Sequence, residues 1–126
     1  MPFIHIKSLP FEKPIDVSDV IVGISNDFAR SVEVEVEHIT VTWGFMLPGH
    51  YASAGRISLY QDDNSHPVLV DLLAPDFNTQ PQVETMLLAT ADSISKRAQV
   101  SRRNIFINYR QAQSGMVYDA GEIVQW

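Results

Sequence analysis

Pro2-Phe3-Ile4-His5-Ile6-Lys7-Ser8 is the stretch that decides the fold. Isoleucines alternate with polar residues in it, and this period of two predicts a half-buried β-strand. About 65 residues later, Pro67-Val68-Leu69-Val70-Asp71-Leu72-Leu73 again begins with proline and again predicts a strand. Two strands of this kind, each with a proline at its start, suggest that the chain contains a structural unit twice.

The segment after each of these strands has the period of an amphipathic helix. The first helix is predicted over roughly Asp16–Ser31, because its apolar residues recur at three- and four-residue spacings. The second helix is predicted to run to about Gln99, and Thr79 with Gln82 three residues later forms a capping box at its start. Each helix should therefore present one apolar face to a core.

Each helix is followed by a further strand-like segment. His38–Phe45 and Asn104–Arg110 are rich in β-branched and aromatic residues, which favour strands. Met46–His66 is predicted to be a long loop with one short strand near Ile57–Tyr60, and the tail, Met116–Trp126, suggests a terminal hairpin or short edge strands.

The order strand, helix, strand thus occurs twice, with offsets of about 65 residues throughout. We expect an α+β fold in a single domain, 1–126, whose repeats span about 1–60 and 66–126. Right-handed crossovers place both helices on one face of a four-stranded mixed sheet. The apolar side chains of the other face then need a partner, most simply another copy of the chain.

Composition excludes several classes of function. The net charge of -6 argues against binding to nucleic acid, and the absence of cysteine excludes disulfides and thiolate chemistry. The four histidines have no metal-ligand spacing, so neither a metal nor another cofactor is expected. No membrane-spanning run or signal-like segment is evident, so a cytoplasmic protein is expected.

Pro2 carries the strongest indication of chemistry. If Met1 is removed, the nitrogen of Pro2 becomes a secondary amine instead of an amide, and it can then accept a proton. The α-amino group is one of the few groups that titrate near neutral pH. The ring at the start of a buried strand would hold that amine in one direction, as a general base or nucleophile requires.

A second stretch, Val100–Tyr109, carries a resemblance to a known family. It has a serine-containing turn that leads into the strand Phe106-Ile107-Asn108-Tyr109. Together with the Met-Pro start and the doubled strand–helix–strand unit, it resembles the tautomerase superfamily, in particular the branch of macrophage migration inhibitory factor, and a bacterial subgroup of that clan is expected. The resemblance implies a homotrimer with three intersubunit sites, in each of which Pro2 interconverts the keto and enol forms of a small α-keto acid.

The same resemblance implies residues that bind substrate. Phe106 corresponds to an aromatic site residue that is usually tyrosine, and Asn108 corresponds to an asparagine two residues later. The branch has a lysine just after the first helix, where this chain has Val34. The substrate carboxylate must then be bound by another cation, for which Arg110 is the first choice, and Lys7, Arg30 and Arg56 are alternatives.

Two other interpretations remain open. Pro2 could act as an acid in hydration or dehalogenation, with Glu35 or Glu37 activating water, although Glu33, Glu35 and Glu37 alternate with valines as a solvated edge would. The chain could also be a trimeric binding protein without catalytic activity, which the missing lysine and the phenylalanine at position 106 favour.

Overall fold

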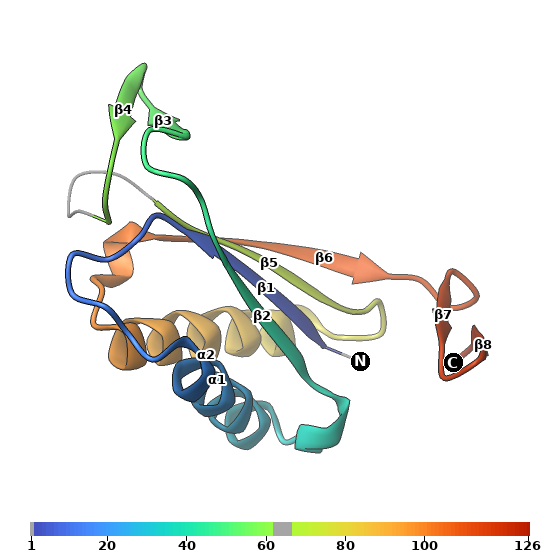
Figure 1. The fold of residues 1–126 in the computed structure, drawn as a ribbon. Helices are drawn as coiled ribbons and strands as arrows, with labels where there is room; N and C mark the ends of the chain where they lie inside the picture. The colour runs from blue at the N-terminus through green and yellow to red at the C-terminus, as the bar shows by residue number, and fades with distance from the viewer. Residues whose placement is uncertain (1, 62–66) are drawn as a thin grey trace.

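The computed structural model describes residues 2–61 and 67–126, and its centre is a four-stranded mixed sheet (Figure 1). The sheet has the order β2-β1-β5-β6, with β1 parallel to β2, β5 parallel to β6, and β1 antiparallel to β5. Its strands are β1 (Phe3–Ser8), β2 (Thr40–Phe45), β5 (Val68–Pro75) and β6 (Ile105–Ala112).

Two helices, α1 (Val17–Val32) and α2 (Gln80–Ala98), lie side by side on one face of this sheet (Figure 1). The predicted α+β fold with both helices on one face is confirmed. One buried cluster takes side chains from both halves, for which reason we infer a single domain of two repeats. Its largest fully buried members include Ile4, Ile24, Phe28, Leu72 and Ile94.

The helix ends follow from local sequence. The Asp16 side chain accepts a hydrogen bond from the backbone N–H of Asp19 and begins α1. The predicted capping box at α2 is confirmed, since Thr79 and Gln82 each bond the other's backbone N–H. Glu33 and Gln99 end the two helices in the left-handed conformation, at φ of 56° and 55°.

Gly23, an unfavourable residue within a helix, allows the two helices to interlock. A Cβ atom at this position would lie 2.4 Å from the guanidinium carbon of Arg97 on α2. Arg97 therefore lies over Gly23 and reaches Asp27, one turn further along α1, with Nε–Oδ2 2.7 Å. Ser93 donates to the same carboxylate at 2.7 Å. Glycine at position 23 thus makes room for a bond network between α1 and α2.

The segment between α1 and β2 differs from the prediction. The strand begins at Thr40 instead of His38, because η1 (Val36–His38) is a turn of 3₁₀ helix. The acidic residues there do not form a strand edge either: Glu33 ends α1, and Glu35 directly precedes η1. The left-handed residue Glu33 and the 3₁₀ turn occupy this segment. The alternation of glutamate and valine therefore does not correspond to a β-strand.

Two small hairpins extend from the ends of the edge strands (Figure 1). The predicted loop after β2 contains β3 (Tyr51–Ser53) and β4 (Arg56–Ser58), joined at Ala54-Gly55 with φ of 53° and 74°. The predicted terminal hairpin is confirmed as β7 (Val117–Asp119) and β8 (Glu122–Val124). A turn, η2 (Arg102–Asn104), shifts the start of β6 to Ile105. The last part of the predicted loop Met46–His66, residues 62–66, lies outside the described residues.

Candidate active site

Pro2 directly precedes β1, one of the two central strands of the sheet. Its side chain is buried, and its carbonyl oxygen accepts a hydrogen bond of 3.0 Å from the backbone N–H of Thr40. This bond joins the start of β1 to the start of β2, so the position of Pro2 is set by two strands that come from different parts of the sequence.

The face of the sheet opposite the helices is a grid of side chains in three rows, because the strand register aligns every second residue. Phe3 begins the row nearest Pro2, His5 the middle row and Lys7 the far row. Across the sheet the rows are Thr40-Phe3-Leu73-Arg110, Thr42-His5-Asp71-Asn108 and Gly44-Lys7-Leu69-Phe106. The helix-free face therefore combines apolar residues at both ends with a polar row between them.

All four predicted substrate-binding residues lie on this face, and three of them line the same hollow. Lys7, Phe106 and Asn108 line a hollow of about 210 Å³. The rest of its lining comes from the neighbouring positions His5, Leu69, Val70 and Asp71. The hollow thus offers an aromatic wall, an amide and an ammonium group within one small space.

Arg110, the first choice for binding a carboxylate, lies in the row nearest Pro2 and is paired with an acid of its own chain. Its Nε donates to Asp71 Oδ1 at 3.2 Å, and both side chains are about half exposed. A pair this exposed is weak, on the order of 1 kcal/mol or less, so a substrate carboxylate can compete for the guanidinium. His5, from the same polar row as Asp71, is hydrogen-bonded to Thr42 instead.

Pro2 and the hollow at Phe106 are separate within one chain. Lys7 is five residues beyond Pro2 along a strand, which is roughly 16 Å at about 3.3 Å per residue. Phe106 lies in the same far row, two strands away. The alternation of the sequence is enough to put Lys7, Phe106, Asn108 and Arg110 on one face. It does not reveal that Pro2 lies at the other end of that face.

A different hollow, of about 380 Å³, opens at the row of Phe3, the residue that follows Pro2, although Pro2 itself does not line it. One side is formed by Phe3, Thr40 and Leu73 of the sheet together with Glu37 and His38 of η1. The other side comes from β7 in the terminal hairpin, with Val117, Tyr118 and Asp119. Sequence reasoning missed this hollow, because no local pattern brings residues near position 38 and residues near position 118 together.

The other candidate cations lie elsewhere. Arg30 pairs with Asp27 on α1 at 2.6 Å, and Arg56 is on the β3–β4 hairpin. Val34, which the sequence resemblance aligns with a lysine of the family, packs against the core cluster.

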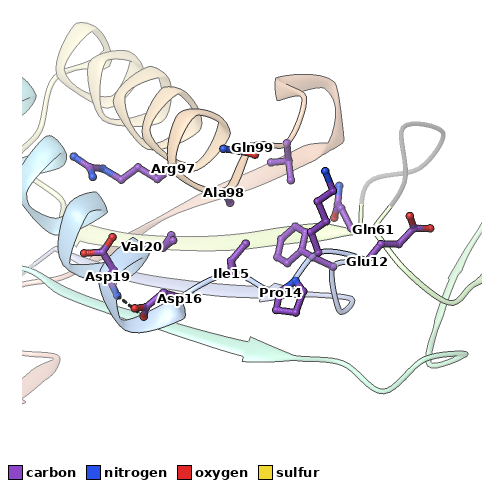
Figure 2. Close-up of a pocket in the computed structure, with 13 residues that line it drawn as sticks. Glu12, Pro14, Ile15, Asp16, Asp19, Val20, Gln61, Arg97, Ala98 and Gln99 are labelled. Atoms are coloured by element: carbon purple, nitrogen blue, oxygen red, sulfur yellow. Dashed lines mark hydrogen bonds between the residues drawn. The ribbon is translucent and has the colours of Figure 1, made fainter.

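A larger hollow, of about 790 Å³, lies at the opposite end of the helices (Figure 2). It is formed by the connection between β1 and α1 and by the last turn of α2, with charges of both signs, such as Asp19 and Arg97. None of the predicted site residues lines it. Within the described residues, neither helix is long and apolar enough to cross a membrane.

Comparison with known proteins identifies the fold. Pt0534, whose structure was solved after inactivation by 2-oxo-3-pentynoate, superposes with a TM-score of 0.82 at 12% identity, over 97% of this chain and 94% of its own. A fused 4-OT, described as a wild-type symmetric trimer, gives a TM-score of 0.82 at 11% identity with the same two coverages. Macrophage migration inhibitory factor from Oncomelania hupensis gives 0.75 at 16% identity, over 99% of this chain and 83% of its own.

No family model and no curated protein match the chain in sequence. At identities of 11 to 16%, the similarity is one of fold. The chain has the fold of the tautomerase superfamily, and the resemblance drawn from the two short sequence stretches is confirmed at that level.

Proposed function

We propose that this protein is a keto–enol tautomerase in which the amine of Pro2, freed when Met1 is removed, acts as general base on a small α-keto acid. The observation that carries the proposal is the place of Pro2. It lies buried at the start of a central strand, in a fold shared with 4-OT proteins.

The chemistry needs an amine that is unprotonated near neutral pH. An ordinary α-amino group has a pKa of about 7.7 to 8.0, and a secondary amine is more basic. Burial disfavours the charged form and lowers the pKa of an amine. The buried position of Pro2 supports this role, because a base with a pKa near the working pH transfers protons most effectively.

The rest of the proposed site comes from another copy of the chain. Phe106, Asn108 and Arg110 lie on β6, an edge strand, whereas Pro2 lies beside β2, the other edge strand. Copies joined from the β6 edge of one to the β2 edge of the next form a heterologous contact, and three copies close into a ring when each contact rotates the next copy by a third of a turn. Such a contact brings the asparagine, as donor to the enolate oxygen, and the arginine, as partner of the carboxylate, towards the proline of the neighbour. Lys7 is the second candidate for the carboxylate.

We expect a homotrimer in solution. Phe3 and Phe106 are exposed on the helix-free face of one chain, and burial of this face stabilises an assembly. A structurally similar fused 4-OT is described as a trimer. Sedimentation equilibrium should give three times the chain mass of 14.2 kDa at micromolar concentrations. A monomer over that whole range contradicts the intersubunit site.

The direct test compares a free with a blocked Pro2. One protein has Pro2 as its verified amino terminus, and the other carries one additional glycine before Pro2, which turns the amine into an amide. With phenylpyruvate as substrate, we expect tautomerisation by the first protein and at least about a 100-fold lower kcat from the second, since an amide nitrogen cannot act as a base. Intact mass confirms each terminus, and circular dichroism confirms equal folding. Equal rates for the two proteins would exclude the Pro2 amine as the general base.

A second candidate function is that of a trimeric binding protein without catalytic activity. It is favoured by Val34, because the position of the family's lysine here contributes an apolar side chain to the core. The same assay distinguishes the two candidate functions. If protein with a verified Pro2 terminus binds phenylpyruvate but does not increase the rate of its tautomerisation, the chain is a binding protein.

A further inference from the structure

Asp71 is the only acid in the three rows of the helix-free face, all of whose residues belong to the described part of the chain. It lies in the middle row on β5, one of the two central strands. His5 lies directly opposite it on β1, and Asn108 is its register partner on β6. A single carboxylate is therefore at the centre of the face that holds the candidate substrate-binding residues.

Two cations of this face lie diagonally from Asp71, one on each neighbouring strand. Arg110 is two positions beyond the register partner of Asp71 on β6, and Lys7 is two positions beyond its partner on β1. Diagonal neighbours are about 7–8 Å apart, a distance that long side chains can span. Arg110 does so, since its Nε donates to Asp71 Oδ1 at 3.2 Å. Lys7 shares with Asp71 the hollow of about 210 Å³.

The ion pair between Asp71 and Arg110 is weak enough to exchange partners. The arginine side chain is 55% exposed and the aspartate side chain 48%, so water screens their attraction. A pair of this exposure changes a binding equilibrium by at most roughly fivefold. Its bond of 3.2 Å is also long, because charge-assisted hydrogen bonds are usually about 2.7–2.9 Å. A ligand carboxylate that meets the guanidinium squarely can therefore replace Asp71.

Lys7 offers the displaced carboxylate a second partner. Once a ligand occupies Arg110, the Asp71 side chain can turn within the hollow towards the ammonium group of Lys7. Without such a partner, the aspartate would face the ligand carboxylate as a like charge, and this repulsion would weaken binding. The exchange thus keeps each charge near an opposite one both before and after the ligand binds.

We propose that Asp71 is a displaceable counter-ion of the substrate-binding site, which pairs with Arg110 in the free protein and moves to Lys7 when a ligand carboxylate binds the arginine. Asp71 is then a positioning residue that sets the affinity for carboxylates. Lys7 supports binding through Asp71 instead of contacting the ligand. This inference rests on the role of Arg110 in the proposed tautomerase function.

Asp71→Asn tests the counter-ion, because asparagine keeps the shape of the side chain and removes its charge. We expect KM for phenylpyruvate to fall about twofold to fivefold with kcat within twofold, since the ligand no longer competes with a carboxylate of the chain. Asp92→Asn is the matched control and should leave KM unchanged, because Asp92 pairs with Arg102 at 2.9 Å on α2, away from this face. An unchanged or higher KM for Asp71→Asn overturns the proposal.

Two double variants show whether Asp71 acts through its two partners. Arg110→Gln should raise the Kd for phenylpyruvate about tenfold, and adding Asp71→Asn should then change it by less than about 1.5-fold. Lys7→Gln should raise Kd about twofold to fivefold by itself and should have no effect in the Asp71→Asn protein. If Asp71→Asn tightens binding equally without Arg110, the acid acts by general repulsion. If Lys7→Gln weakens binding equally without Asp71, the lysine binds the ligand directly. Either result overturns the exchange.

Binding measured without turnover separates this inference from the proposed function. In the Pro2→Ala background, calorimetric titration with phenylpyruvate should give the same pattern of Kd values, and circular dichroism confirms that each variant is folded. That pattern, without catalysis by the wild type, would contradict the tautomerase and leave the counter-ion. Catalysis by the wild type, with a Kd that Asp71→Asn leaves unchanged, would contradict the counter-ion and leave the tautomerase. Absence of phenylpyruvate binding in all variants would contradict both.

Discussion

Pro2→Ala is expected to lower kcat for phenylpyruvate tautomerisation by about 100-fold or more. General base catalysis by a positioned group contributes about 10²- to 10⁴-fold. Alanine leaves a terminal amine, but it removes the ring that fixes the direction of the nitrogen at the start of β1. KM should change far less than kcat, since the proposed binding residues, Asn108 and Arg110, are intact.

The pH profile gives this prediction a second readout. In the wild type, kcat/KM should fall as the pH decreases through the pKa of the Pro2 amine, because the protonated amine cannot accept the substrate proton. Pro2→Ala retains a terminal amine that also titrates, so its residual rate should follow the pKa of that ordinary α-amino group instead. Intact mass must show that Met1 is absent from both proteins. Equal rates for the two proteins, or no rate from either, would remove Pro2 from the mechanism.

Asp27→Ala is expected to have the largest effect on stability, a loss of about 2 kcal/mol. The Asp27 carboxylate is only 15% exposed and accepts hydrogen bonds from Arg97, Ser93 and Arg30. Its removal leaves the Arg97 guanidinium, itself 32% exposed, without that partner above Gly23. Breaking one side of a partly buried ion pair costs more than the pair contributes, because the remaining charge stays desolvated.

Urea unfolding at a fixed protein concentration measures this loss, and Asp92→Ala is the matched control. Asp92 also pairs with an arginine of the chain, Arg102, at 2.9 Å, but both side chains are more than half exposed. A pair of that exposure contributes under about 1 kcal/mol, so the control should be nearly neutral. Equal losses for the two variants would contradict the role given to the Asp27 network.

The stability that Asp27 contributes should depend on pH in one direction. The hydrogen bond from Arg97, the largest effect, holds the pKa of the Asp27 carboxyl well below its usual range. The unfolded chain, with an aspartate pKa of about 3.9, then binds the proton more readily than the folded chain. The contribution is complete above that pKa and is lost as the pH falls below about 4 towards the folded value. The stability gap between wild type and Asp27→Ala should therefore narrow from pH 5 to pH 2.

The sequence predicts the sheet and helices well because each has a strong periodic signal. Ile4 and Ile6 alternate with polar residues, and the apolar stripe around Ile24 and Phe28 continues through four turns. The short elements have no such signal. The β3–β4 hairpin depends on positive φ at Ala54 and Gly55, and an alanine gives no sequence signal for a turn of this type. In the sequence alone, Gly23 is simply an unfavourable residue within a predicted helix. Its role is evident only from the structure, in which the Arg97 side chain lies over it.

The sequence likewise predicts one part of the candidate site and not the other. Strand alternation is sufficient to place Phe106, Asn108 and Arg110 on the helix-free face, because side chains two residues apart share a face. The separation of Pro2 from Phe106 depends on strand order and direction, which no local pattern specifies. The hollow between η1 and β7 depends on residues that lie some eighty positions apart in the chain.

The two repeats also set the stoichiometry of any chemistry at Pro2. Pro67 precedes β5 as Pro2 precedes β1, and both residues are buried. A chain has one amino terminus, however, so the nitrogen of Pro67 is always an amide and can never titrate. Fusion of two such units therefore halves the number of terminal amines per sheet. Pro67 at the start of β5 therefore has no role as a base. A ring of three chains would contain six such prolines, three at position 2 and three at position 67, of which only the three at position 2 could act as bases.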